Sequence, residues 1–377
     1  MCIRDSIMSS HFLSLSRRIR KTHFTDRVIE NGVKGFTVYN HMLLPTYFKS
    51  IEEDYHHLKN EVQVWDVSCE RQVQIKGKDA FKLLEMITPR NLNKLSEKKC
   101  LYVPLVNSKG FMVNDPVIIK VSKEKYWISI ADSDVLLWID GIVSALNLDI
   151  IIEEPDISPL AIQGPKSELL ASKVFGSKIN NLKLFDIDCF NFEGEELLVA
   201  KSGYSKQGGY EIYVNGPDVA IKLWDALFEE GKNLNVRAGC PNLIERVEGG
   251  LLSYGNDMTI TNTPFECNLE KFVQKIVPNH CISARSLNSS KIKNPGKIIR
   301  SLSIDYKNPI YCENIWKIIN KKNEIIGRVT SGAFSPDFDT TVALGMIDIN
   351  YLNDEEDLFT IIGEKKYLTK IHEKPFI

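Results

Sequence analysis

A glycine-rich turn that runs directly into an alternating strand is the most restrictive feature of this sequence. Residues 201–214 read Lys-Ser-Gly-Tyr-Ser-Lys-Gln-Gly-Gly-Tyr-Glu-Ile-Tyr-Val. The glycines permit a positive φ or a close approach of backbone to a flat group. The alternation that follows predicts a half-buried strand with Glu211 and Tyr213 on the same face. A carboxylate beside an aromatic ring can bind a flat heterocycle with N–H donors, whereas the simpler interpretation is a hairpin whose Glu faces water.

The composition is that of an ordinary globular protein. The chain has 377 residues with 43% hydrophobic and 25% charged residues, enough for two or three domains. A formal net charge of −2 gives no reason to expect nucleic acid or an acidic membrane as a partner, and no apolar run approaches the length of a transmembrane helix. The eight cysteines lie far apart, without a Cys-x-x-Cys or a zinc-like spacing, so we expect reduced thiols, a cytoplasmic protein and no metal. Its partners are expected to be small molecules and, in addition, a second copy in a homodimer.

The pattern along the chain predicts four segments. We interpret residues 1–7 as a non-native extension, with Met8 as the native start. Residues 8–285 are expected to form an α+β body of two subdomains, because strands alternate with helical crossovers. Residues 286–297 are polar and predict a linker. The short strands of residues 298–377 predict a small antiparallel barrel.

Hydrophobic periodicity places the individual elements. An apolar loop is expected at residues 39–45. Helices are expected at residues 51–60, 78–88, 135–146 and 218–230. Strands are expected at residues 62–67, 72–77, 101–106, 116–121, 126–130, 299–304, 316–319, 324–329, 341–347, 358–362 and 367–372.

The turn and strand at residues 201–214 resemble the Gly-Tyr-Thr-Gly-Glu-x-Gly-Phe-Glu-Ile signature of the glycine cleavage T proteins, the folate-binding aminomethyltransferase family. Four more landmarks keep the order of that family: residues 101–110, 161–165 (Ala-Ile-Gln-Gly-Pro), 246–256 (Arg-Val-Glu-Gly-Gly to Tyr-Gly-Asn) and 329–336. The resemblance implies a folate-binding body with a central cavity, followed by a C-terminal antiparallel β-barrel that helps to close the site.

Two departures argue against glycine-cleavage chemistry. In T proteins the turn after Asn107 ends in two aspartates, the first of which is the essential acid, whereas this chain has Asn114 and Asp115. An amide cannot exchange a proton near neutral pH, and Asp115 should point to the opposite face as a structural hydrogen bonder. An arginine expected to contact folate is also replaced within Pro241-Asn242-Leu243.

Longer stretches resemble the dimethylsulfoniopropionate demethylases, a branch of the same family. They include residues 43–48, 65–72, 113–117, 129–134, 205–209 and 249–258. A sulfonium methyl leaves a neutral thioether, so its transfer to tetrahydrofolate needs no acid, and Asn114 is acceptable there. The faces of aromatic rings attract such a cation by roughly 0.5–2 kcal/mol each. Candidate rings are Tyr102, Tyr204, Tyr210 and Tyr213, and many demethylases carry Trp where this chain has Tyr204.

These resemblances imply roles for individual residues. Glu211 is expected to contact the pterin ring. The other expected cofactor-binding residues are Tyr102, Arg246 and Tyr254. The methyl donor is expected to meet Tyr204, Ser129, Tyr213 and Lys206, with Lys201 and Arg246 as further candidates for its carboxylate. The expected catalytic residues are Tyr213, Tyr102 and Asn114.

Three other functions stay open at this point. An aminomethyltransferase of the glycine cleavage system predicts an acid at position 114 and a lipoyl-carrier partner. A demethylase of aryl methyl ethers needs a proton donor, and the sequence offers no strong candidate His or Cys beside the folate motifs. A non-catalytic folate-binding paralogue would carry a Lys-Gly-Cys-Tyr-x-Gly-Gln-Glu signature, which this sequence lacks.

Overall fold

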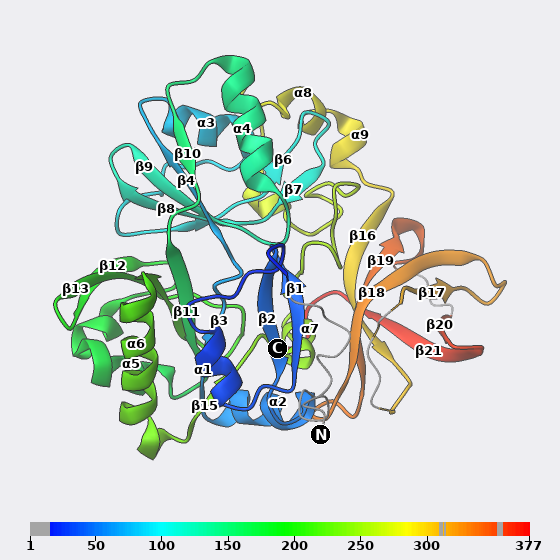
Figure 1. Cartoon of the computed structure of the whole chain (residues 1–377). Coiled ribbons are helices and arrows are strands. Elements are labelled where there is room, and N and C mark those ends of the chain that lie inside the picture. Colours follow the sequence, from blue (N-terminus) through cyan, green and yellow to red (C-terminus); the bar gives the residue numbers. More distant parts are fainter. Residues whose placement is uncertain (1–15, 309–311, 313, 353–356) are drawn as a thin grey trace.

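A computed structural model describes residues 16–308, 312, 314–352 and 357–377. The proposed extension at residues 1–7 lies outside this range. In Figure 1, two sheets and their helices form the left and upper part of the molecule, and a barrel forms the right part. An upright hairpin and helix α7 (Leu243–Glu248) lie between the two parts. This arrangement confirms the expected α+β body followed by an antiparallel barrel.

The larger sheet of the body has six strands in the order β12-β13-β14-β11-β3-β15. Tyr210, Ile212 and Trp224 belong to the core on its helix-covered face. The strands are β12 (Ile187–Phe192), β13 (Glu195–Ala200), β14 (Gly209–Asn215), β11 (Ile157–Gln163), β3 (Val62–Asp66) and β15 (Val236–Gly239), and the covering helices are α5 (Ser167–Phe175) and α6 (Pro217–Glu230).

The second sheet has five strands in the order β10-β4-β9-β8-β5. Val73, Ile75 and Ile128 pack against the residues of two helices in one core. The strands are β10 (Ile151–Glu153), β4 (Gln72–Lys76), β9 (Lys125–Ser129), β8 (Val117–Ser122) and β5 (Leu101–Tyr102), and the helices are α3 (Ala80–Ile87) and α4 (Val135–Leu146).

The faces of the two sheets that carry no helices turn toward one another. The rings of Trp127 on β9 and Tyr213 on β14 lie 6.0 Å apart, centroid to centroid. A small apolar cluster that includes Cys100 and Ile187 surrounds this contact. Because side chains alternate along a strand, Glu211 shares the face of Tyr213 and also points into the space between the sheets.

Two local expectations are wrong. The segment 39–45 is not a loop, because β1 (Gly35–Tyr39) and β2 (Met42–Tyr47) form a hairpin whose turn residues Asn40 and His41 have φ of 49° and 63°. The expected strand at 101–106 is two short strands, β5 and β6 (Leu105–Val106), which pair with β8 and β7 (Met112–Asn114) respectively. Pro104 stands between them, and proline has no N–H for a strand ladder.

The barrel closes in the order β16-β19-β18-β17-β20-β21. Its strands are β16 (Lys297–Ile304), β17 (Trp316–Ile319), β18 (Ile325–Ser335), β19 (Thr340–Asp348), β20 (Leu358–Ile362) and β21 (Lys365–His372). Residues 286–297 contain the end of α8 (Ala284–Leu287), α9 (Ser290–Lys293) and the start of β16. Strand β18 runs beyond the expected bounds of 324–329 and includes the Thr-Ser-Gly-Ala-Phe-Ser segment. Two further helices are α1 (Thr25–Glu30) and α2 (Ile51–Asn60).

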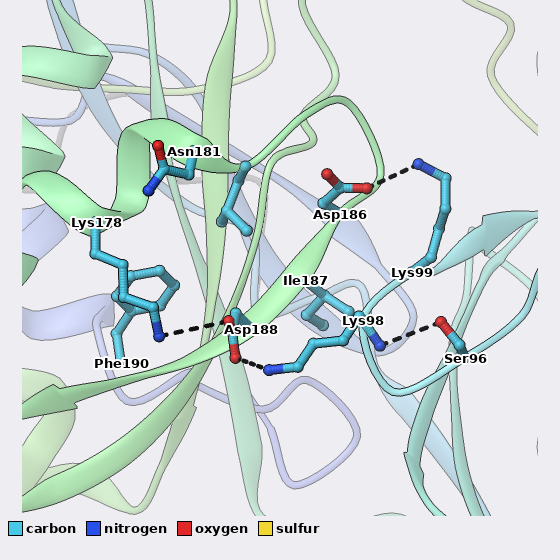
Figure 2. A pocket seen from close by; sticks show the side chains of 10 residues that line it. Ser96, Lys98, Lys99, Lys178, Asn181, Asp186, Ile187, Asp188 and Phe190 are labelled. Atoms are coloured by element: carbon cyan, nitrogen blue, oxygen red, sulfur yellow. Dashed lines mark hydrogen bonds and ion pairs between the residues drawn. The ribbon is translucent and has the colours of Figure 1, made fainter.

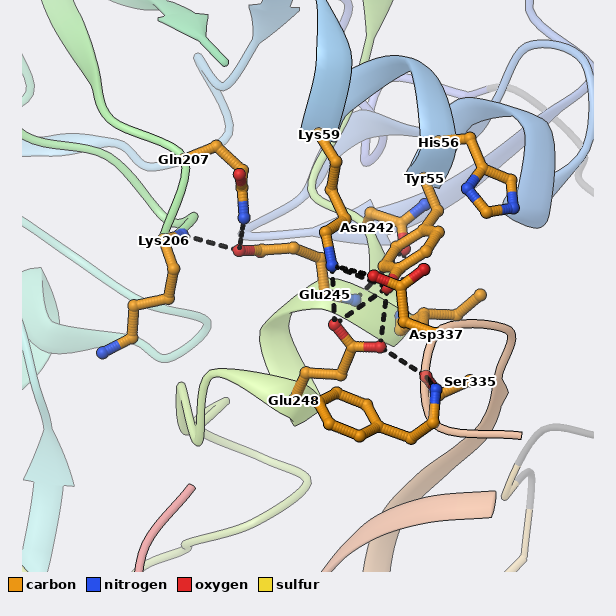
Figure 3. Close-up of polar contacts among 12 residues, drawn as sticks. Tyr55, His56, Lys59, Lys206, Gln207, Asn242, Glu245, Glu248, Ser335 and Asp337 are labelled. Carbon is orange, nitrogen blue, oxygen red and sulfur yellow. Dashed lines mark hydrogen bonds and ion pairs between the residues drawn. The ribbon is translucent and has the colours of Figure 1, made fainter. Parts of the chain in front are cut away.

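Buried polar contacts join the barrel to the body at helix α7. The fully buried carboxylate of Glu248 accepts hydrogen bonds from Tyr55 on α2, at 2.8 and 3.1 Å, and from Ser335 on β18, at 2.6 Å. The ammonium of Lys59 lies 3.7 Å from Glu248 and also bonds Asp337 (Figure 3). Burial raises the pKa of Glu248, so its charge depends on these donors.

We expect Glu248→Ala to lower the free energy of unfolding by about 3–5 kcal/mol, because two buried hydroxyls and Lys59 lose their shared acceptor. Chemical denaturation of the whole chain measures the loss. The matched control is Glu229→Ala at an exposed pair with Lys232, for which a change within about 0.5 kcal/mol is expected. A loss at Glu248 no larger than that of the control would contradict a role in holding the barrel.

Candidate functional site

The glycine-rich turn that precedes β14 is built around the side chain of Gln163. A Cβ on Gly203 or Gly209 would lie 2.1 or 2.2 Å from the Gln163 amide nitrogen, so only glycine fits at either position. Gln163 Nε2 donates to the carbonyl of Ser202 at 3.2 Å, and Ser205 Oγ donates to Gln163 Oε1 at 2.7 Å. The Ala-Ile-Gln-Gly-Pro motif therefore shapes the turn that leads into the Glu211 strand.

Glu211 presents a half-buried carboxylate between the sheets. Its Oε2 accepts hydrogen bonds from Ser202 Oγ at 2.6 Å and from the Tyr213 hydroxyl at 3.4 Å. In the described part of the chain no donor bonds Oε1, which leaves that oxygen for the N–H of a ligand. Burial raises the pKa of Glu211, while the two hydroxyl donors lower it.

A second acidic group, Asp115, faces the same space. The Tyr102 hydroxyl donates to Asp115 Oδ2 at 2.9 Å, and Oδ1 is buried with no hydrogen-bond partner in the described structure. Burial raises the pKa of Asp115 to about 7. Asp115 lies on the expected face, opposite to Asn114, and that face is the one that holds Tyr102.

Asn114 points the other way and is fully used by the protein. Its amide donates to the Ala131 carbonyl at 2.9 Å and to Ser133 Oγ at 2.8 Å, and its carbonyl accepts from the Ala131 N–H at 3.0 Å. Asn40 of the hairpin holds the same loop, since its side chain bonds the Ala131 carbonyl and the Ser133 N–H. The two asparagines thus fix a loop near the site, and the structure brings neither amide together with Glu211.

Two site residues were missed from the sequence. Glu70 is half-buried and has no side-chain hydrogen bond within the described residues, and burial together with the charges of Glu211 and Asp115 holds its pKa well above the usual range. Tyr39, at the tip of β1, has a raised pKa because of burial and then of the charge of Glu70. Asp115 was expected only as a structural hydrogen bonder, and the register that pairs Tyr102 with Val117, two residues from Asp115, is seen only in the structure. Glu70 had no signal in the sequence, since it lies in a turn between two strands.

Tyr204 and Tyr254 lie at the side of this space nearest to helix α7. The Tyr204 hydroxyl donates to the carbonyl of Leu252 at 2.7 Å, and the Tyr254 hydroxyl to that of Met112 at 3.4 Å. Burial raises the pKa of both phenols, and the charge of Asp115 adds to each shift.

The remaining expected residues have other surroundings. The guanidinium of Arg246 bonds Asp257 at 3.0 Å and Ser331 of the barrel at 2.7 Å, so it joins barrel to body. Ser129 is buried on β9 and accepts from Gln72 at 2.9 Å. The side chain of Lys206 is exposed and points away from Glu245 in Figure 3. Tyr210 and Lys201 are not with Glu211: Tyr210 is buried on the helix side of β14, and the Lys201 ammonium lies 5.3 Å from its ring.

One surface pocket lies away from this space, as Figure 2 shows. This pocket of about 430 Å³ is lined by Lys98, Lys99 and Lys178 together with Asp186, Asp188 and Phe190. Lys98 and Lys178 share Asp188 and Lys99 pairs with Asp186, so the two aspartates offset two of the three positive charges. Within the described residues, no three His, Cys, Asp or Glu side chains gather to hold a metal ion, and no helix there has the length and hydrophobicity to cross a membrane.

Comparisons with known proteins agree with this fold. Residues 24–276 match the family model of the GCVT N-terminal domain, and residues 299–377 match the glycine cleavage T-protein C-terminal barrel domain. The chain is 49% identical over 333 residues to the dimethylsulfoniopropionate demethylase DmdA of Ruegeria pomeroyi, covering 88% of this chain and 90% of that protein. It is 28% identical to the aminomethyltransferase of a Thermoanaerobacter species, covering 88% and 91%.

A solved structure gives the same fold. The crystal structure of glycine cleavage system aminomethyltransferase T from Bartonella henselae superimposes with a TM-score of 0.84 over 95% of this chain and 98% of that one. Its sequence is only 20% identical, so this likeness speaks for the fold alone. From the two family models and the relative at 49% identity, we conclude that this chain belongs to the glycine cleavage T-protein family of folate-dependent aminomethyltransferases.

Proposed function

We propose that this protein is a tetrahydrofolate-dependent demethylase that takes a methyl group from the sulfonium of dimethylsulfoniopropionate. The products are methylmercaptopropionate and 5-methyltetrahydrofolate. The observation that carries the proposal is the group of carboxylates and tyrosines between the sheets, with Glu211 at its centre and one oxygen free for a ligand N–H. The 49% identity to a protein named as such a demethylase supports it.

The residues present suit a folate ring. Glu211 Oε1 has no protein donor among the described residues and can accept the N–H groups of a pterin, while Tyr102 and Tyr254 supply neighbouring ring faces. When bound, tetrahydrofolate supplies a secondary amine that accepts the methyl group. Arg246 is a weaker candidate for this role than the sequence predicts, because Asp257 and Ser331 already occupy its guanidinium.

The protein's contribution is position and charge rather than proton transfer. The leaving thioether is neutral, so no group on the chain has to protonate it. Holding the two reactants in line and excluding water can be worth an effective molarity of up to ~10⁵–10⁸ M. The rings of Tyr204, Tyr213 and Tyr102, with the carboxylates of Glu70 and Asp115, form surroundings that attract a soft cation. Ser129 and Lys206 remain our candidates for the carboxylate end of the donor.

Aminomethyl transfer is the second candidate, and Asp115 is the observation that favours it. With a pKa raised to about 7 by burial, Asp115 can exchange a proton near neutral pH even though Asn114 cannot. That function also requires a lipoyl-bearing carrier protein as a partner.

The deciding experiment is anaerobic incubation of the purified protein with tetrahydrofolate and dimethylsulfoniopropionate. We expect 5-methyltetrahydrofolate to accumulate, as measured by chromatography, in amounts equal to the methylmercaptopropionate formed. A parallel reaction receives an aminomethylated lipoyl carrier instead. Turnover of the carrier without methyl transfer from the sulfonium would replace the first function by the second.

Glu211→Gln is expected to raise the Kd of tetrahydrofolate by about 10- to 100-fold, because hydrogen bonds to a charged acceptor contribute about 1.5–3 kcal/mol. Isothermal titration calorimetry measures the change. Glu196→Gln, on the exposed face of the adjacent strand β13, is the matched control and should leave the Kd unchanged. Equal affinity of the Glu211 variant and the wild type would remove Glu211 from the folate site.

The donor KM should fall about tenfold as the pH rises from 6 to 8. Asp115, with its pKa near 7, is neutral below this value and charged above it, and only the charged form attracts a sulfonium. Asp115→Asn keeps an acceptor for the Tyr102 hydroxyl but cannot ionise, so its donor KM should be flat over this range. If the step persists in Asp115→Asn, another group, such as Glu70, is the one that titrates.

We also infer a cytoplasmic location and a homodimer. The eight separate cysteines suit a reducing compartment, and the described ones are free thiols. Size-exclusion chromatography with light scattering tests the dimer.

A further inference from the structure

Helix α7 carries three buried charged residues, Glu245, Arg246 and Glu248, and each has its own set of partners. Arg246 and Glu248 bond residues of the barrel. Arg246 also reaches the glycine-rich turn, because its guanidinium and the Tyr204 hydroxyl both bond the Leu251 carbonyl. Glu245 turns toward the backbone of the same turn. Its Oε1 accepts the backbone N–H of Lys206 at 2.6 Å and the side-chain amide of Gln207 at 3.4 Å (Figure 3).

The buried carboxylate of Glu245 lowers the stability of the fold. Glu245 is fully buried, and its Oε2 has no hydrogen-bond partner in the described structure. A buried carboxylate with one unsatisfied oxygen destabilises a fold relative to an apolar side chain of similar size. No positive charge pairs with it within the described residues, since its bonds come from a peptide N–H and an amide. The contact with the turn is therefore what the carboxylate provides.

The turn that Glu245 holds is the one that carries Tyr204. Tyr204 is tied at its hydroxyl to the carbonyls of Leu251 and Leu252, at 3.2 and 2.7 Å. On one side of it, Ser205 is bonded to Gln163. Lys206 and Gln207, which follow directly, have Glu245 as their anchor on the body. Without Glu245, the segment between Ser205 and Gly208 loses its strongest fixed point.

We propose that Glu245 is a positioning residue that sets the ring of Tyr204 against the methyl donor by fixing the backbone of Lys206. Glu245 touches neither reactant. The identity of the methyl donor rests on the proposed function, whereas the effect of Glu245 on the turn does not. Loss of the contact raises the donor KM and leaves tetrahydrofolate binding at Glu211 intact.

Two substitutions of Glu245 separate the contact from the burial. Glu245→Leu keeps the helix and the volume but removes the acceptor, so we expect the KM for dimethylsulfoniopropionate to rise about tenfold, with the tetrahydrofolate Kd within twofold of the wild type. Glu245→Gln can still present its amide oxygen to the Lys206 N–H, so its donor KM should stay within about twofold. The matched control is Glu53→Gln on the surface of α2, which pairs with Arg237 and should change neither constant.

Amide hydrogen exchange of the peptide spanning residues 202–208 tests the turn without any donor. We expect exchange at least tenfold faster in Glu245→Leu, wild-type exchange in Glu245→Gln, and unchanged exchange in the barrel. Unchanged exchange in Glu245→Leu would overturn the proposal, and so would faster exchange with an unchanged donor KM. If the wild type transfers no methyl group, the proposed function fails, and the exchange result alone then decides whether Glu245 fixes the turn.

A thermal melt of each variant tests whether the protein is folded at the assay temperature. If Glu245→Leu melts below the assay temperature, Glu245→Met takes its place, because its unbranched side chain is closer in shape to Glu and also removes the acceptor of the Lys206 N–H. Faster exchange confined to residues 202–208 in that variant supports the proposal, and its absence counts against it.

Discussion

The alternation of side chains along β14 is the constraint on which the site depends. Tyr210, Ile212 and Val214 must face α5 and α6, because that side holds the largest core of the body. The residues between them are then directed into the space between the two sheets. The pairing of Glu211 with Ala161 on one neighbour and Ala200 on the other fixes this register. A slip of one residue would drive the carboxylate into an apolar core, so folding and ligand binding are served by the same pairing.

The second constraint is the set of buried polar contacts that helix α7 makes with other parts of the molecule. It is only six residues long, yet its buried charges reach the turn before β14, the strand β18 and the helix α2. A short helix has little hydrophobic surface, and polar contacts with fixed directions supply the specificity that area cannot. The barrel is thus attached to the body through the helix that also supports the glycine-rich turn.

Sequence patterns predicted the sheets, the principal helices and the barrel because each has a strong period and an apolar face. They also predicted that Glu211 and Tyr213 share a face. They did not predict the hairpin at residues 35–47, since Asn40 is a marker of positive φ but His41 follows it in place of the glycine that usually completes such a turn. The site was harder. Asn114 and Arg246 were expected in the site because they stand in motifs. A motif does not reveal whether a polar side chain bonds the protein itself or a ligand. In the structure both side chains bond protein partners. Glu70 and Glu245 become visible only when their burial is known.

The close packing of two glycines against Gln163 restricts how this chain can have diverged from its relatives. A methyl group at Gly203 or Gly209 collides with the same amide, so neither glycine can change while Gln163 keeps its size. A smaller residue at position 163 would relieve the collision at Gly203 but not the one at Gly209, where a Cβ would also lie 2.2 Å from the Ile162 carbonyl oxygen, and it would leave Ser205 without its acceptor. Substitutions at Gln163, Gly203 and Gly209 therefore depend on one another, and each intermediate sequence would carry a weakened turn. New ligand specificities should arise more readily at Tyr204, whose ring can be exchanged without disturbing this trio.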